Sequence, residues 1–125
     1  MENSSHMFIE MEKMNGGTLE SFINKYKQDN NTEALPEELA SSILRDILSG
    51  LCQIHAKDFI HRDLKPENIL MNISAEENSD GEEEEKITAK IADFGLSAEF
   101  RINITGPGSK NTSEITGTVL YMAPE

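Results

Sequence analysis

The chain has 125 residues, enough for one small domain, and its 23 acidic against 11 basic residues give a formal net charge of -12. A field of that sign argues against binding of nucleic acid or of an anionic membrane surface. A single cysteine, Cys52, excludes an internal disulfide, and no apolar run approaches the roughly 20 residues of a transmembrane helix. The first residues lack a secretory signal, so we expect a cytoplasmic location, with the nucleus as the alternative.

The first quarter of the chain predicts a strand followed by a short helix. Residues 6–14 alternate weakly and include several large apolar side chains, which suits a short buried strand that ends at residues 15–17. Apolar residues recur at helical spacing over 19–26, and the Thr18 hydroxyl is placed to cap this helix. The polar stretch 27–32 is expected to be the loop that leaves it.

A long helix is the firmest prediction, and it begins near Pro36. Proline is tolerated in the first turn of a helix, and Glu37 and Glu38 complement the positive end of the helix dipole. An apolar stripe then continues through about five turns, because apolar residues recur every three or four positions. Its members are Leu39, Ile43, Ile47, Leu51 and Ile54. The helix is expected to end near residues 55–58.

Two short apolar stretches with strand character, 69–73 and 87–92, flank the acidic segment 74–86. The simplest arrangement is a β-hairpin whose overlong loop is solvated and disordered. A flexible loop tolerates such an insertion, since each doubling of its length costs only about 0.6 kcal/mol. Binding of a basic partner is the sharper alternative for this acidic insert.

Three short motifs follow one another in the second half of the chain. They are HRDLKPEN at 61–68, DFG at 93–95 and APE at 123–125. In isolation, Asp63 and Asn68 could be ordinary turn-formers around a proline, and DFG alone is little more than a turn signal. Together and in this order, the motifs resemble the catalytic loop, the magnesium-binding turn and the end of the activation segment of eukaryotic protein kinases.

This resemblance implies an α+β, protein-kinase-like fold that is partial and covers residues 1–125. It would comprise a hinge strand, a helical portion of the C-lobe with the catalytic loop and a β-hairpin, and a long activation segment over 93–125. The stretch between Gly95 and Gly117 is rich in Ser, Thr, Asn and Gly and reads as a mobile loop. The implied activity is transfer of the γ-phosphate of ATP to Ser or Thr hydroxyls of protein substrates, with ATP and Mg²⁺ as cofactors.

The resemblance gives each polar residue of the motifs a catalytic role. Asp63 would be the catalytic base, which orients the substrate hydroxyl and accepts its proton. Asn68 and Asp93 offer the hard oxygen ligands that suit Mg²⁺. Lys65 would place a positive charge near the transferred phosphate, and a lysine here is typical of serine/threonine kinases. The alternative for Lys65 is a solvated loop residue.

Upstream, residues 11–19 resemble the kinase hinge and the start of the following helix. Met11 would be the gatekeeper, and the backbones of Glu12 and Met14 would bond the edge of adenine. Leu70 would form the floor of the adenine site, although its side chain equally suits the core of a plain strand. By itself, the segment reads only as a strand that ends in a Gly-Gly turn.

The last residues, 117–125, resemble the peptide-docking end of the activation segment. Thr118 would hydrogen-bond toward Asp63 and Lys65, as in serine/threonine kinases. This resemblance supports Ser and Thr as the acceptor residues of the substrate.

Regulation is implied by Arg62, which precedes the catalytic aspartate. This is the pattern of kinases whose activation loop is ordered by a phosphate paired with the arginine. The position that such kinases usually phosphorylate is occupied here by Glu114, whose carboxylate could pair with Arg62 permanently. The alternative phosphorylation sites are Thr112, Ser113 and Thr116.

The 125 residues include no Gly-rich phosphate loop, no strand lysine for the phosphates and no partner glutamate from a regulatory helix. We therefore expect the isolated polypeptide to have negligible kinase activity and marginal stability. A non-catalytic, kinase-like binding module or a truncated product is the alternative to an enzyme. All four polar catalytic residues are present, which favours the enzyme.

Overall fold

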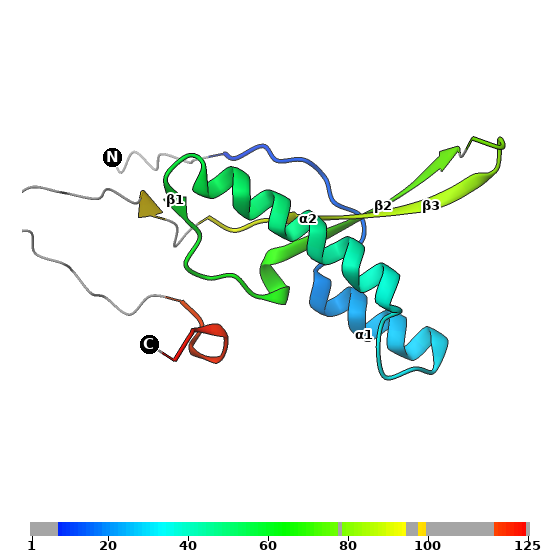
Figure 1. Ribbon diagram of the computed structural model, residues 1–125, viewed down its shortest axis with the longest axis horizontal. Helices are drawn as coiled ribbons and strands as arrows, with labels where there is room; N and C mark the ends of the chain where they lie inside the picture. The colour runs from blue at the N-terminus through cyan, green and yellow to red at the C-terminus, as the bar shows by residue number, and fades with distance from the viewer. Residues whose placement is uncertain (1–7, 78, 95–97, 100–116, 125) are drawn as a thin grey trace, which may run out of the picture.

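The computed structural model describes residues 8–77, 79–94, 98–99 and 117–124 (Figure 1). In chain order the elements are α1 (Leu19–Asn30), α2 (Glu37–His55), β1 (Phe59–Ile60), the 3-10 turn η1 (Pro66–Asn68), β2 (Ile69–Glu77), β3 (Glu83–Ile91), β4 (Ala98–Glu99) and a second 3-10 turn η2 (Val119–Tyr121). Figure 1 shows α2 lying along part of the β2–β3 hairpin, with α1 beside the N-terminal half of α2. The tip of the hairpin projects beyond both helices.

Helix α1 begins where the sequence predicts. The Thr18 hydroxyl accepts a hydrogen bond from the Ser21 N–H at 3.2 Å, as expected of an N-cap. The expected exit loop at 27–32 is wrong over its first four residues, because the helix continues to Asn30. Asn31 then adopts the left-handed conformation, and its N–H returns to a carbonyl of the last turn. That cap lets the polar end of the segment stay helical.

The predicted long helix is confirmed as α2, which ends at His55. Its apolar stripe faces the hairpin, where Ile43 is buried with Ile69, Met71 and Ala89. Around this small core pack partly buried residues from α1, α2 and the hairpin, which include Leu19, Phe22, Leu39, Ile47 and Ile91. Neither α1 nor α2, the helices of the described part of the chain, is both long and apolar enough to cross a bilayer.

The hairpin is much longer than expected, and the prediction of a disordered loop over 74–86 is wrong. Strands β2 and β3 pair antiparallel from Ile69↔Ile91 to Glu77↔Glu83, so most of the acidic segment is part of the ladder. The described turn residues lie between these strands, at 79–82. Backbone pairing extends into the segment because every residue of the ladder finds a partner directly opposite.

Acidic side chains face one another near the tip of this hairpin. Glu76 lies opposite Glu84, and Glu77 lies opposite Glu83. Like charges in directly opposed positions are destabilising. Lys86 offsets part of this repulsion, because its Nζ contacts both carboxylate oxygens of Glu76 at 2.9 and 3.0 Å.

The expected buried strand over 6–14 is also wrong in its described part, 8–14, which forms no strand. Phe8, Ile9 and Met11 are 90%, 76% and 73% exposed. A strand is stable only beside a pairing partner, and pairing with the described residues of β2 begins further along, at Asn15.

Residues 15–18 form hydrogen bonds to the outer edge of β2 and one isolated bridge, between Thr18 and Leu70. The side-chain amide of Asn15 donates to the Ile73 carbonyl and accepts from the Ile73 N–H, both at 2.8 Å. The Gly16 N–H donates to the Met71 carbonyl, and the Met71 N–H donates to the Gly17 carbonyl, again at 2.8 Å. This junction joins the hinge-like segment to the strand that follows the catalytic loop.

Candidate active site

The catalytic-loop segment 61–65 is held by the buried ring of His61, which is 2% exposed. One ring nitrogen, Nε2, lies 2.9 Å from the Ala92 carbonyl, and the other, Nδ1, accepts the Asp63 N–H at 3.3 Å. These partners require a neutral ring with its hydrogen on Nε2. The ring also makes an edge contact with Phe94, with 5.2 Å between centroids. His61 therefore ties the catalytic loop to the chain on either side of residue 93.

Asp63 accepts hydrogen bonds from three side chains. Its Oδ1 accepts from the Thr118 hydroxyl at 2.6 Å, and its Oδ2 lies 3.0 Å from both Lys65 Nζ and Asn68 Nδ2. The hydrogen bond from Thr118, followed by that from Lys65, lowers the pKa of Asp63 to about 2, although burial opposes them. Asp63 is therefore ionised throughout the physiological range.

The Thr118 hydroxyl is shared between two residues of the catalytic loop. It donates to Asp63 and accepts from Lys65 Nζ at 2.8 Å. One oxygen of Thr118 thus joins it to Lys65, 53 positions earlier in the sequence, and to Asp63, 55 positions earlier. Gly117 makes this approach possible: its φ is 126°, and a Cβ there would collide with the Arg62 carbonyl oxygen. The hydrogen bond that Lys65 itself donates to Asp63 is the main reason that the pKa of Lys65 is raised.

Asn68, at the end of η1, connects the catalytic loop to the segment that carries Asp93. Its side chain is buried, and Nδ2 donates to both the backbone carbonyl and the carboxylate of Asp63, at 2.8 and 3.0 Å. The backbone carbonyl of Asn68 accepts the Ala92 N–H at 2.8 Å. Asp93 follows directly, with a left-handed φ of 60° and an exposed position, and its charge contributes to the raised pKa of Lys65.

Asn68 and Asp93 carry oxygen atoms of the kind that could hold a magnesium ion. The Asn68 amide nitrogen is engaged by Asp63, so the amide oxygen is the atom left to bind a cation. The Asp93 carboxylate, one residue beyond Ala92, could supply a second hard oxygen ligand. Mg²⁺ usually keeps several waters and shares phosphate oxygens, so two protein ligands are sufficient.

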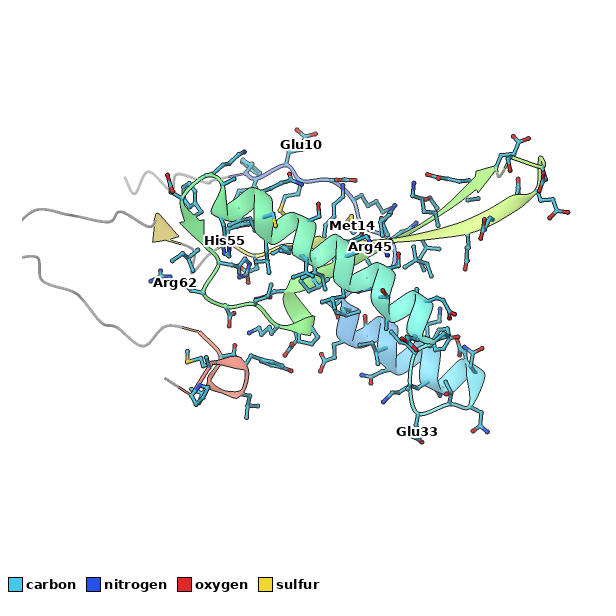
Figure 2. The ribbon with its side chains drawn as sticks, viewed as in Figure 1. Glu10, Met14, Glu33, Arg45, His55 and Arg62 are labelled. Carbon is cyan, nitrogen blue, oxygen red and sulfur yellow. The ribbon has the colours of Figure 1, made fainter. Side chains whose placement is uncertain are left out.

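The four residues predicted to contact adenine lie around the hairpin and its junction with the N-terminal segment. Met11 is exposed, and Met14 is half-buried where the N-terminal segment meets the hairpin (Figure 2). Glu12 forms an ion pair with Lys90 of β3, with 2.5 Å between Nζ and Oε2. Leu70 is half-buried on β2. The structure thus attaches the hinge-like segment to both strands of the hairpin.

Of the residues predicted to regulate the site, the structure describes Arg62 and Thr118. Arg62 is exposed on the catalytic loop and has a left-handed φ of 67° (Figure 2). The remaining candidates lie outside the described residues: Thr112, Ser113, Glu114 and Thr116.

Sequence reasoning missed two residues that shape the site. His61 lies inside the recognised motif, but no pattern in the sequence indicated that both of its ring nitrogens bond the backbone. Asp46 Oδ2 accepts the Ala89 N–H at 2.9 Å. A signal was available for Asp46, since it stands between Ile43 and Ile47 of the apolar stripe, where a carboxylate is out of place.

Comparison with known proteins agrees with this geometry. The sequence matches the protein kinase domain family over residues 1–125. It is 37% identical to the serine/threonine-protein kinase nekl-2 of Caenorhabditis elegans, over 94% of this chain and 29% of that protein. It is 36% identical to MAP kinase-interacting serine/threonine-protein kinase 1 of Xenopus tropicalis, over 99% of this chain and 27% of that protein.

A third relative is the DNA damage response protein kinase DUN1 of Saccharomyces cerevisiae, 36% identical over 94% of this chain and 22% of that protein. The chain thus spans less than a third of the length of each of these curated relatives. The chain belongs to the protein kinase family, its relatives include serine/threonine kinases, and its helices and hairpin form part of an α+β kinase fold.

Proposed function

We propose that the protein containing this chain is a serine/threonine kinase, which transfers the γ-phosphate of ATP to Ser or Thr hydroxyls of protein substrates. The observation that carries the proposal is the environment of Asp63. An ionised carboxylate offers about four acceptor positions, and three are taken by Thr118, Lys65 and Asn68. The remaining position, on Oδ1, is available to a substrate hydroxyl.

The lowered pKa defines what Asp63 does there. A carboxylate with a pKa of about 2 is a weak base, so it orients the hydroxyl and takes the proton only as the new bond to phosphorus forms. Late proton transfer suits phosphoryl transfer, whose transition state is loose and demands mainly positioning and charge neutralisation. Asp63 is thus suited to align an incoming Ser or Thr oxygen.

Charge neutralisation falls to the other residues of the cluster. The ammonium group of Lys65, held by Asp63 and Thr118, supplies a fixed positive charge beside the position of the substrate hydroxyl. Asn68 and Asp93 would hold Mg²⁺, which, when bound, neutralises charge on the phosphate oxygens. The backbones of Glu12 and Met14 and the side chains of Met11 and Leu70 would bind adenine.

The test is phosphate transfer by the complete gene product, with ATP, Mg²⁺ and peptides that differ only in their acceptor residue. We expect transfer to Ser and Thr peptides and much less to the Tyr peptide. Asp63→Asn keeps the size of the side chain but removes its negative charge, and should lower kcat by at least about 100-fold. Nucleotide binding without transfer by the wild-type protein would instead support a non-catalytic binding module.

A further inference from the structure

Asp46 of α2 satisfies a backbone group on the free edge of β3. In the β2–β3 ladder Ala89 lies opposite Met71, and the Met71 N–H is directed outward, to Gly17. Residues opposite each other in an antiparallel ladder direct their backbone groups the same way, either toward each other or both outward. The Ala89 N–H therefore points away from β2, and the half-buried Asp46 carboxylate accepts it at 2.9 Å.

This hydrogen bond lies four residues before the candidate magnesium ligand Asp93. Between them, Ala92 is fixed on both of its backbone groups: its N–H bonds the Asn68 carbonyl at 2.8 Å, and its carbonyl lies 2.9 Å from His61 Nε2. The segment that leads to Asp93 is thus tied down at three points. Two ties come from the catalytic loop, and the third comes from a different element, α2.

Helix α2 is a suitable anchor because it packs directly on β3. Ile43 and Ala89 share the buried core, and Gly50 allows the side chain of Ile91 to approach closely. Asp46 lies one turn after Ile43, so its carboxylate fixes the register of β3 along the helix, which apolar contacts alone define less sharply. A charged acceptor makes a shorter and stronger hydrogen bond than a neutral one.

Asp46 also lines a cavity of about 800 Å³ between α2 and β3, whose other lining residues include Phe94. Water entering from this cavity could satisfy the Ala89 N–H if the carboxylate were removed, but it would not hold the strand to the helix. The expected consequence of losing Asp46 is therefore displacement of β3 and of the residues after it, more than loss of folding.

We propose that Asp46 is a positioning residue for the magnesium-nucleotide site, which holds Asp93 in register with Asn68 through β3. The proposal rests on the function proposed above. It predicts that Asp46 influences the metal-bound nucleotide and has little influence on the protein substrate, because the residues toward the peptide side, Asp63 and Thr118, are held by other contacts.

The test compares variants of the complete gene product by two measurements that require no turnover. One is binding of ADP with and without Mg²⁺, and the other is hydrogen exchange of the backbone amides over 87–93. Asp46→Ala should speed exchange in this segment and weaken the magnesium-dependent part of ADP binding roughly tenfold, the effect of losing one well-formed hydrogen bond. Where activity is measured, the peptide KM should stay unchanged.

Matched variants separate positioning from a general loss of structure. Asp46→Asn keeps a neutral acceptor oxygen at the same distance from the backbone and should be less impaired than Asp46→Ala. Asp46→Ser, whose hydroxyl is one bond shorter, should behave like Asp46→Ala and carries the test if the alanine variant does not fold. Arg45→Ala removes an exposed charge from the neighbouring position of α2 and should change neither measurement.

Unchanged exchange and unchanged magnesium-dependent binding in Asp46→Ala would overturn the proposal, as would an Asp46→Asn variant as impaired as Asp46→Ala. Failure of the proposed function gives a different pattern. In that case the wild-type protein transfers no phosphate, whatever the Asp46 variants do in the two binding and exchange measurements.

Discussion

Replacing Gly16 by alanine should detach the hinge-like segment from β2. A Cβ at this position would lie 2.8 Å from the Met71 Cβ, 2.9 Å from its carbonyl oxygen and 3.0 Å from its carbonyl carbon. Real Cβ atoms do not approach so closely, and Met71 is fully buried, so it cannot move aside. The strain must be relieved by separating Gly16 and Gly17 from the strand.

The size of the effect follows from the contacts that this separation weakens. Two backbone hydrogen bonds, Gly16 N–H to Met71 O and Met71 N–H to Gly17 O, are directly affected, and each contributes about 0.5–1.5 kcal/mol. Their loss therefore lowers the free energy of unfolding by about 1–3 kcal/mol, a large fraction of the 5–15 kcal/mol typical of a domain. Adenine binding should weaken as well, since Met14 precedes this junction.

Chemical denaturation of the complete gene product measures the change, with Gly50→Ala as the matched control. Gly50 lies within α2, and a Cβ there would meet the side chain of Ile91, 3.2 Å from its terminal Cδ1 and 3.5 Å from its Cγ1. Alanine favours a helix interior over glycine by about 0.5–1 kcal/mol, so Gly50→Ala should be neutral or mildly stabilising. Equal stability of Gly16→Ala and wild type would refute the close packing described for Met71.

Thr118→Val keeps the shape of the side chain but removes the hydroxyl shared by Asp63 and Lys65, so kcat should fall roughly tenfold or more, while Thr118→Ser should retain most activity in the same steady-state assay. The pKa of Asp63 is lowered in the fold to about 2 from an ordinary value of 3.8, so its stabilising contribution is complete above about pH 4 and is lost as the pH falls toward 2. The acid unfolding of Asp63→Asn should therefore depend less on pH in this window than that of the wild-type protein. Identical unfolding curves would contradict the assigned contacts. Lys86→Gln removes the cation paired with Glu76 and should lower the local stability of the hairpin tip by less than about 1 kcal/mol. Amide exchange at the tip should then be faster, and added salt should slow it. Exchange that does not respond to salt would argue against charge repulsion at the tip.

Local patterns predicted the elements whose stability is local. The stripe from Leu39 to Ile54 defined α2, and the hydroxyl of Thr18 defined the start of α1, because both signals depend only on neighbours within a few residues. The catalytic loop was recognised from its residue types, and the structure brings Asp63, Lys65 and Thr118 together across more than 50 positions.

The failures concern features that depend on distant partners. Residues 8–14 have the composition of a buried strand, but they are not assigned to one, and backbone pairing with β2 begins after them. The charges of 74–86 suggested a loop, whereas backbone pairing continues through 74–77 and 83–86 because β3 supplies a partner for every residue of β2. Neither the bond from Asp46 to Ala89 nor the contact of His61 with Ala92 is encoded in a local period, since each of these partners is more than 30 positions away.

The central claim is that Asp63, Asn68 and Asp93 act on one magnesium-bound triphosphate. Calorimetric titration of the complete gene product with ADP, in Mg²⁺ and in excess EDTA, tests it most directly. The wild-type protein should bind ADP more tightly with Mg²⁺, and Asp93→Ala and Asn68→Ala should each reduce that gain without changing binding in EDTA. Equal affinity of the wild-type protein under both conditions would contradict the claim.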